Sequence, residues 1–503
     1  MAESLRPGTE RILTRAEQGL IVFLFVNPFL DFVTGYMMNN GITLGLPASL
    51  TVSLMVRMAV LGVMALYVLA RRDWSAVWTV VPIGLAALLS VASELMAGND
   101  VELFADIQYA SKFIYNVAAF LVFWHVLKRR YGDRETRLAL LNRLFTWAAF
   151  WVAGSILATF ALDIYASSYY NFFGTTGVRG FFFSGNEATA ILMALLPFGL
   201  RDALLRLADG PKRLRDLLRL LPPALTVNAL LLIGTKTAFA GIGLSLALLL
   251  VYALVEAVRY QRPARVYTMI CVLGVAALVY VGMGWVTDGR SGQIVDKAVS
   301  LQSYYLKQMH DLPQDIVEQM TLQEREAMGS KESFLGRLLS GRMGLLNYNI
   351  REWRGGLPVT WLFGLGRGSR LRVIEMDLSE IFLFYGVLGV ICFCWPYARQ
   401  LWRVAGAFLR RWDFDGYCAA VSLGAVGSYA LLAGHVFFTV TGGFYFALIL
   451  LYATLHYDLD PMQKPLEKGS VKNAALGALK ALGTAAGAFL KRAARKTDKE
   501  VCR

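Results

Sequence analysis

The chain alternates long apolar runs with short basic connections. Crossing the hydrocarbon core of a bilayer, which is roughly 30 Å thick, takes about 20 apolar residues in a helix. Twelve runs approach or reach this length, near residues 19–37, 50–70, 75–96, 111–127, 144–163, 187–201, 221–235, 237–257, 266–286, 380–398, 415–436 and 439–457. The pattern predicts an all-α integral membrane protein with about twelve transmembrane helices.

One long polar segment interrupts this pattern and divides the chain. We expect transmembrane helices 1–9 in residues 1–286, a large loop in 287–379, helices 10–12 in 380–457, and a basic tail in 458–503. Apolar spacing in residues 294–299 and 334–339 of the loop predicts short amphipathic helices that cover the bundle. A mobile hydrophilic loop is the alternative. The tail fits either a helix lying on anionic lipid or a disordered basic segment.

Composition and charge set the class of protein and its orientation. Of the 503 residues 56% are hydrophobic and 17% charged, whereas soluble domains contain about 25% charged residues. The net charge of +14 is explained by topology, because Lys and Arg collect in short cytoplasmic loops. The segments on the same side of the membrane as the N-terminus hold 34 Lys and Arg. The short segments on the other side, with the large loop left out, hold 3. We therefore expect both termini in the cytoplasm, the large loop outside, and no nucleic-acid partner.

Two opposite charges lie inside the first two apolar runs. Asp31 and Arg57 stand at similar depth in the outer halves of these runs. Charged residues within a membrane are costly and are usually paired or functional. We expect a structural ion pair here in preference to direct contact with a ligand.

Three cations are expected on the outer side of the membrane. Arg179 precedes the sequence Ser184-Gly185-Asn186-Glu187, which opens a helix; Lys236 lies in a tight turn between two runs; Arg342 lies in the large loop. Arg binds phosphate in a bidentate manner and Lys binds it as a point charge. Together they predict a diphosphate site, although Lys236 alone would fit a side chain that extends to the membrane interface.

The order of these motifs resembles the O-antigen ligase and polymerase superfamily. The motifs run from about residue 170 to 440, and they are Arg179-Gly180-Phe181, Gly185-Asn186-Glu187, Lys236, Ser340-Gly341-Arg342, Gly364-Leu365-Gly366, Glu375-Met376-Asp377 and the helix of residues 385–389. The resemblance implies an inverting glycosyltransferase of GT-C type in the bacterial cytoplasmic membrane. It implies undecaprenyl-diphosphate-linked glycans as donor and acceptor, no metal or other cofactor, and chain-length regulator or flippase proteins as partners. Arg179, Lys236 and Arg342 match the diphosphate-binding cations of the family, with Asn186 beside them as a substrate-binding residue.

One departure from the ligase pattern favours the polymerase branch. Ligases carry a His-Asn pair where this chain has Glu375-Met376-Asp377. Ligases also usually have Arg in the turn where this chain has Lys236. We therefore expect polymerisation of lipid-linked repeat units into a surface polysaccharide. Ligase-type transfer to another acceptor is the alternative, and so is a flippase of lipid-linked oligosaccharide. A flippase would be expected to show two similar halves, which are not evident in this sequence.

Glycosyl transfer needs a base near the acceptor hydroxyl. Glu375 and Asp377 are the candidates, and we favour Glu375 because it matches the position of the ligase His. Asp377 could instead cap the following helix, an ordinary role for Asp at that position. His435 is a third catalytic candidate, although a lone His in an apolar run is more often a packing residue.

Overall fold

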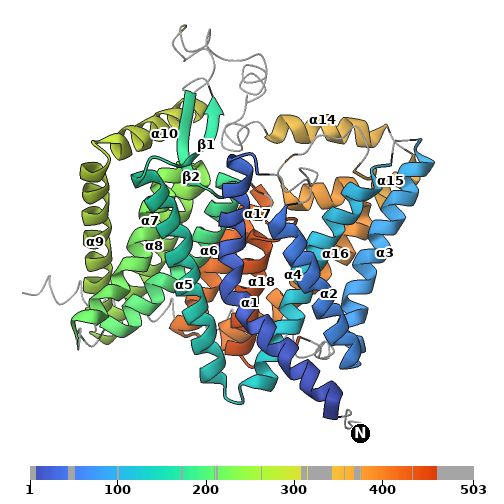
Figure 1. Cartoon of the computed structure of the whole chain (residues 1–503), viewed down its shortest axis with the longest axis horizontal. Helices are drawn as coiled ribbons and strands as arrows, with labels where there is room; N and C mark the ends of the chain where they lie inside the picture. Colours follow the sequence, from blue (N-terminus) through green and yellow to red (C-terminus); the bar gives the residue numbers. More distant parts are fainter. Residues whose placement is uncertain are drawn as a thin grey trace, which may run out of the picture.

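The computed structural model describes residues 7–42, 51–98, 101–171, 174–208, 210, 213–261, 263–306, 314, 342–355, 357–367, 374, 376–432, 434 and 436–461. Long helices run side by side and form a bundle (Figure 1). Ten helices in the described ranges are long and apolar enough to cross a membrane. They are α1 (Pro7–Asn39), α2 (Val52–Ala70), α3 (Trp74–Met96), α4 (Leu103–Arg130), α5 (Arg134–Ala161), α6 (Gly185–Leu207), α7 (Leu221–Ile233) with the preceding 3-10 helix η1 (Leu214–Leu220), α8 (Lys236–Tyr260), α9 (Ala264–Val286) and α16 (Asp377–Arg410).

Two further helices lie where the eleventh and twelfth spans were expected. They are α17 (Phe414–Leu432) and α18 (Gly442–His456). The 15 residues of α18 cover only about 22 Å at 1.5 Å per residue, which is less than the thickness of a bilayer core. The structure thus establishes ten candidate spans in its described part, and the total of twelve remains a prediction.

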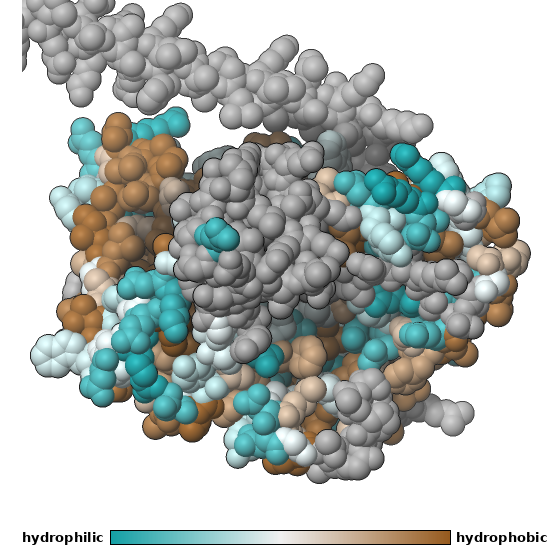
Figure 2. All heavy atoms as spheres, turned by 90° about the horizontal axis from the view of Figure 1, so that it is seen from above, coloured by the Kyte–Doolittle hydropathy of each residue, from teal (hydrophilic) through white to brown (hydrophobic). Residues whose placement is uncertain are grey.

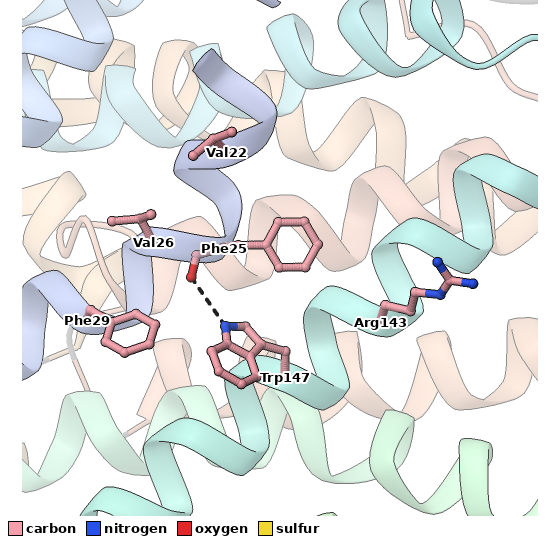
Figure 3. A pocket seen from close by; sticks show the side chains of 6 residues that line it. All are labelled: Val22, Phe25, Val26, Phe29, Arg143 and Trp147. Atoms are coloured by element: carbon pink, nitrogen blue, oxygen red, sulfur yellow. Dashed lines mark hydrogen bonds between the residues drawn. The ribbon is translucent and has the colours of Figure 1, made fainter. Parts of the chain in front are cut away.

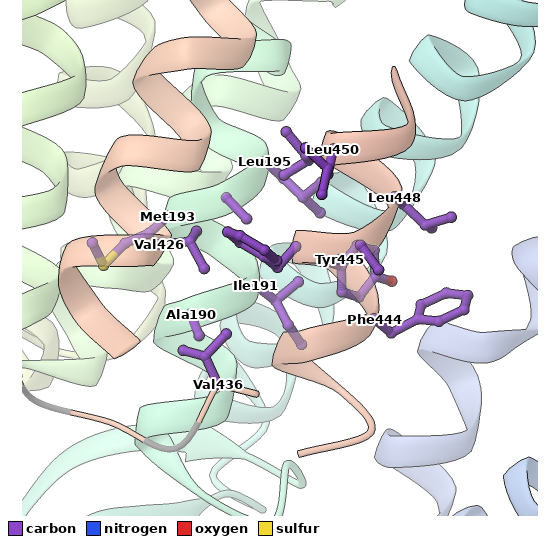
Figure 4. Packing of buried hydrophobic residues seen from close by; sticks show 14 of the residues in the cluster. Ala190, Ile191, Met193, Leu195, Val426, Val436, Phe444, Tyr445, Leu448 and Leu450 are labelled. Atoms are coloured by element: carbon purple, nitrogen blue, oxygen red, sulfur yellow. The ribbon is translucent and has the colours of Figure 1, made fainter. Parts of the chain in front are cut away.

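The core of the bundle is built around α18. Every residue of this helix is buried, as expected for a helix that is apolar on all sides. It packs against α4, α5, α6 and α17. Side chains such as Ile191 and Leu195 of α6 and Val426 of α17 meet Tyr445 and Leu448 of α18 (Figure 4). This packing holds α6 and the segment before α18, both of which contribute to the site described below.

A β-hairpin stands at the end of the bundle opposite the N-terminus (Figure 1). Strands β1 (Ala166–Asn171) and β2 (Gly174–Gly180) pair antiparallel, with Tyr169 opposite Thr176. The described structure is mostly helical, as predicted, but the sequence analysis did not predict this hairpin. The Tyr, Thr and Val residues of the two segments favour extended backbone. Gly174 has a φ of 76°, which glycine adopts without strain.

The same end carries three shorter helices, α10 (Arg290–Leu306), α14 (Arg342–Arg354) and α15 (Pro358–Phe363). We call this end, with β1, β2, α10, α14 and α15, the hairpin face. The helix predicted from residues 294–299 is confirmed as part of α10, which buries Ala298 and Leu301 and leaves Val299 half exposed. The segment 334–339 and the tail beyond 461 lie outside the described residues.

Candidate active site

A cavity of about 240 Å³ lies between the helices at the hairpin face. Its walls come from the end of α1, the starts of α2, α4 and α6, and the α17–α18 loop, which we define as residues 436–441. The lining residues are Asp31, Thr34, Thr51, Ser53, Leu54, Arg57, Gln108, Lys112, Phe183, Glu187, Phe438, Thr439, Val440 and Thr441. Hydrophilic residues gather on this face, as the view from above shows (Figure 2).

An ion pair closes the floor of the cavity. The Arg57 guanidinium donates to both carboxylate oxygens of Asp31, each at 2.6 Å, and its Nε donates to Asn27 Oδ1 at 2.9 Å. Arg57 is fully buried and Asp31 is 6% exposed. The expected ion pair is confirmed. A buried pair that loses one partner leaves an uncompensated charge, so replacing either residue alone should weaken the packing of α1 against α2.

The α17–α18 loop forms another wall with irregular backbone. Such backbone is tolerated at membrane depth only where it is buried in protein or lines a cavity. The Asn116 side-chain amide donates to the carbonyls of Phe437 and Thr439, at 3.0 and 2.9 Å. A side chain at Gly443 would come within 2.0 Å of Asn116 Nδ2, so this close approach requires glycine.

Asp377 holds the same loop from the side of α16. Its buried Oδ2 accepts hydrogen bonds from the backbone N–H groups of Val436 and Phe437, both at 2.8 Å. The helix cap is Met376, and its side chain makes no capping bond. The suggestion that Asp377 caps α16 was therefore wrong. Its carboxylate instead fixes the loop that lines the cavity.

The first turn of α6 places an acidic side chain at the cavity. The Ser184 hydroxyl accepts from the backbone N–H of Asn186 at 3.1 Å and caps the helix. Glu187 follows in the first turn, where the helix dipole favours a negative charge. The cations Arg57, Lys112 and Arg179 all act electrostatically on Glu187, and none of the three pairs with it within 4.0 Å in the described chain. The Glu187 carboxylate is therefore near these cations without forming an ion pair with any of them.

Arg179 reaches this region from β2. It is half-buried, and its Nε is buried without a hydrogen bond to any described residue. Burial lowers the pKa of the Arg179 guanidinium, and the nearby Glu187 carboxylate opposes this effect. Arginine stays protonated in proteins, so the group remains a cation with free donor capacity. Beside it, the Tyr169 hydroxyl donates to Asn186 Oδ1 at 2.9 Å, which ties the predicted substrate-binding residue to the hairpin.

Lys236 is the first residue of α8 and is half-buried. The turn before it starts at Gly234, which is left-handed with a φ of 71°. The Gln302 side chain on α10 donates to the Gly234 carbonyl at 3.0 Å. A side chain at Gly177 in β2 would come within 2.3 Å of a carbonyl oxygen at the end of α7. The Lys236 turn and the strand of Arg179 are therefore packed together.

Arg342 is the first residue of α14, and it is half-buried. This helix packs on α16, and its Trp353 ring stacks on Trp361 of α15 at 4.3 Å. The hairpin and the α7–α8 turn are thus joined by direct packing, whereas Arg342 belongs to a group of helices around α16. Convergence of Arg179, Lys236 and Arg342 on one ligand remains a prediction.

The Gly364-Leu365-Gly366 motif fills a break in α16. Gly386 has a φ of 66° within this helix, which leaves carbonyls before the break without their usual partners. The backbone N–H groups of Leu365 and Gly366 donate to the carbonyls of Leu383 and Phe384, each at 3.1 Å. The motif thus connects the large loop to α16 and brings the next residue, Arg367, against α4.

Sequence reasoning missed Arg367, Lys112 and Glu187. The Arg367 guanidinium lies between two aromatic rings, 3.6 Å from the Tyr109 ring centroid and 4.4 Å from that of Phe384. Such cation–π contacts depend on the tertiary fold. Lys112 is the second residue of the fourth apolar run, where a cation is usually solvated, and only the fold places it at the cavity.

The two remaining catalytic candidates, Glu375 and His435, lie outside the described residues. Their described neighbours, Met376 and Val436, are both buried. Asp377 bonds to the backbone of Val436, so the chain segments that carry the two candidates are joined at this point. Their roles stay predictions.

A family model described as "O-antigen ligase like membrane protein" matches residues 15–460. The chain belongs to this family. No curated protein matches it. Membership in the O-antigen ligase-like family confirms the resemblance inferred from the motif order. It supports a role in glycan transfer by a multi-pass membrane protein, with lipid-linked glycans as substrates.

Proposed function

We propose that the protein polymerises undecaprenyl-diphosphate-linked oligosaccharide repeat units into a surface polysaccharide. Transfer takes place at the hairpin face, on the outer side of the bacterial cytoplasmic membrane. The observation that carries this proposal is the cavity lined by Lys112 and Glu187, with Arg179 nearby and its buried Nε without a hydrogen bond to any described residue. Such an arrangement suits a ligand that carries both negative charge and hydroxyl groups.

The cations stabilise the leaving group, which is the diphosphate. In an inverting transfer, the acceptor hydroxyl oxygen attacks the anomeric carbon while the bond from that carbon to the diphosphate oxygen breaks. Negative charge develops on the departing diphosphate, where preorganised donors stabilise it most. We assign Arg179 and Lys112 to this role, and we keep Lys236 and Arg342 as further diphosphate ligands.

The proton of the acceptor hydroxyl goes to a general base. We retain Glu375 as the proposed base, with His435 as the next candidate. Asp377 accepts two backbone hydrogen bonds through one oxygen, so we propose that it positions the loop beside the cavity. Asn186, whose carbonyl is held by Tyr169, presents its amide group to the sugar.

Ligase-type transfer is the second candidate, and the family description favours it equally. The two functions differ in their products. Purified protein given fluorescent lipid-linked repeat units should yield a ladder of products if it is a polymerase. A single addition that requires a different acceptor would identify a ligase. Substrate that stays unchanged both with repeat units alone and with a different acceptor added would contradict glycan transfer.

The proposed sidedness has its own test. In a cysteine-free background, a cysteine at the exposed position Thr175 in β2 should react with a membrane-impermeant maleimide on intact cells. A cysteine at the exposed Arg410, at the end of α16, should react only after the cells are broken. The opposite pattern would place the hairpin face in the cytoplasm.

A further inference from the structure

A second open space lies on the side of the bundle, between α1 and α5. It is an apolar groove of about 600 Å³ lined by Val22, Phe25, Val26, Phe29, Arg143 and Trp147 (Figure 3). Arg143 and Trp147 also line a polar cavity of about 840 Å³ that extends toward the end of the bundle opposite the hairpin face. Groove and cavity therefore form one crevice, apolar at one end and polar at the other.

A bend in α1 shapes the groove. Pro28 lies inside this helix, where it lacks a backbone donor and bends the chain, and α1 changes direction along its length (Figure 1). The Trp147 indole donates to the Phe25 carbonyl at 3.3 Å and links the two helices (Figure 3). Val22 and Val26 are 60% and 44% exposed. The groove is therefore open on its outer side.

Arg143 stands at the junction of the groove and the cavity. It lies nine residues after the start of α5, which places it about 13 Å along the helix at 1.5 Å per residue. It is exposed, and no ion pair joins it to any residue in the described chain. Arg143 directly precedes the apolar run 144–163, so its guanidinium lies near the membrane interface, where lipid phosphates are found.

The other charges of the cavity are largely satisfied within the protein. Arg201 donates to both carboxylate oxygens of Asp415, at 2.8 and 2.7 Å, and Arg219 donates to Asp202 at 2.5 Å. Arg134, like Arg143, forms no ion pair with a described residue. Five arginines and three acidic residues line the cavity, so it carries an excess of positive charge beside an apolar groove.

We propose that this crevice binds an anionic phospholipid from the leaflet opposite the hairpin face. One acyl chain lies in the groove between α1 and α5, and the phosphate contacts Arg143 and Arg134. The crevice shares no lining residue with the cavity at the hairpin face. The bound lipid is thus a structural partner of the helix pair and separate from the glycan substrate.

Native mass spectrometry of the purified full-length chain tests the proposal. The probes are phosphatidylglycerol and phosphatidylcholine with identical acyl chains, supplied at equal concentration. We expect retention of phosphatidylglycerol in preference to phosphatidylcholine. Arg143→Gln should weaken phosphatidylglycerol binding roughly fivefold, the effect of one basic residue near a charged headgroup, whereas Arg143→Lys should retain it.

Arg410→Gln is the matched control, because Arg410 is an exposed cation at the end of α16 that does not line the crevice. It should bind phosphatidylglycerol as the unmodified protein does. Equal retention of the two lipids would overturn the proposal, as would equal losses in Arg143→Gln and Arg410→Gln. Gel filtration of each variant separates lost binding from lost folding, and Arg143→Lys keeps the test decisive if Arg143→Gln does not fold.

Discussion

Replacing Asp377 separates a catalytic role from a positioning role. In Asp377→Ala the backbone N–H groups of Val436 and Phe437 lose an acceptor that lies 2.8 Å from each. A buried donor left unsatisfied costs about 1–3 kcal/mol, so the two together predict a loss of about 2–6 kcal/mol in the free energy of unfolding. Asp377→Asn keeps an amide oxygen in the same place, so both backbone donors retain an acceptor. We therefore expect a smaller loss, of about 1 kcal/mol, the net contribution of one ordinary hydrogen bond.

Thermal unfolding in detergent, followed by tryptophan fluorescence, ranks the two variants. We expect the midpoint to fall much further for Asp377→Ala than for Asp377→Asn, and Asp377→Asn to retain most of its polymer ladder. Asp163→Asn is the control on the same face, because Asp163 pairs with Arg290 at an exposed site, where an ion pair contributes only about 0–1 kcal/mol. Asn also tolerates the left-handed backbone of this residue, which has a φ of 59°. If Asp377→Asn folds with an unchanged midpoint and forms no polymer, Asp377 is the base and our reasoning is wrong.

Three further substitutions test other parts of the structure. Arg179→Ala should slow polymerisation about 10²–10³-fold, as loss of one donor to a developing anion does, whereas Arg179→Lys should recover part of the rate; normal polymer from Arg179→Ala would remove it from the site. Arg57→Met should destabilise the fold by about 3–5 kcal/mol, and the double variant Arg57→Met with Asp31→Leu should destabilise it much less. Thermal unfolding measures both, and equal destabilisation would show that Arg57 and Asp31 do not act as a buried ion pair. Gly366→Ala should lower the unfolding midpoint, because Gly366 has a φ of 70° and an added Cβ would lie 2.5 Å from the Glu94 carboxyl carbon. Gly62→Ala should leave the midpoint unchanged, because no atom lies within 4 Å of the added Cβ.

Much of the helical scaffold follows from the sequence. Apolar runs of the right length place α1 to α9 and α16 close to the expected residues, because helices are the favoured way to bury backbone polar groups in lipid. The pairing of Asp31 with Arg57 also follows, since both charges lie at similar depth in adjacent runs. These features depend on local pattern and on the fixed thickness of the membrane.

Other features depend on contacts between distant segments. The break at Gly386 is stable only because the backbone of Leu365 and Gly366 satisfies the carbonyls it releases. The role of Asp377 is set by Val436, which lies 59 residues away in the chain. The hairpin was missed because its strands are short and interrupt no apolar run. Periodicity within a single segment cannot reveal such pairings.

Some residues of the candidate site can be proposed from local sequence pattern, and others only from contacts between distant segments. Arg179 and Asn186 could be proposed from the sequence because they flank a helix start at a predicted membrane boundary, and their roles stay predictions. Glu187 was seen only as part of that motif, and its setting among cations became evident once α2, α4 and β2 were placed beside α6. Lys112 was passed over because it stands at the very start of an apolar run, where a cation is usually solvated.

The location of the diphosphate tests the central claim most directly. A structure of the protein in nanodiscs with undecaprenyl diphosphate would show it. Our account predicts the two phosphates at the hairpin face, within hydrogen-bond distance of Arg179 and Lys112 and with Glu187 across the cavity. A diphosphate bound elsewhere, for example beside Arg143 at the other end of the bundle, would contradict it.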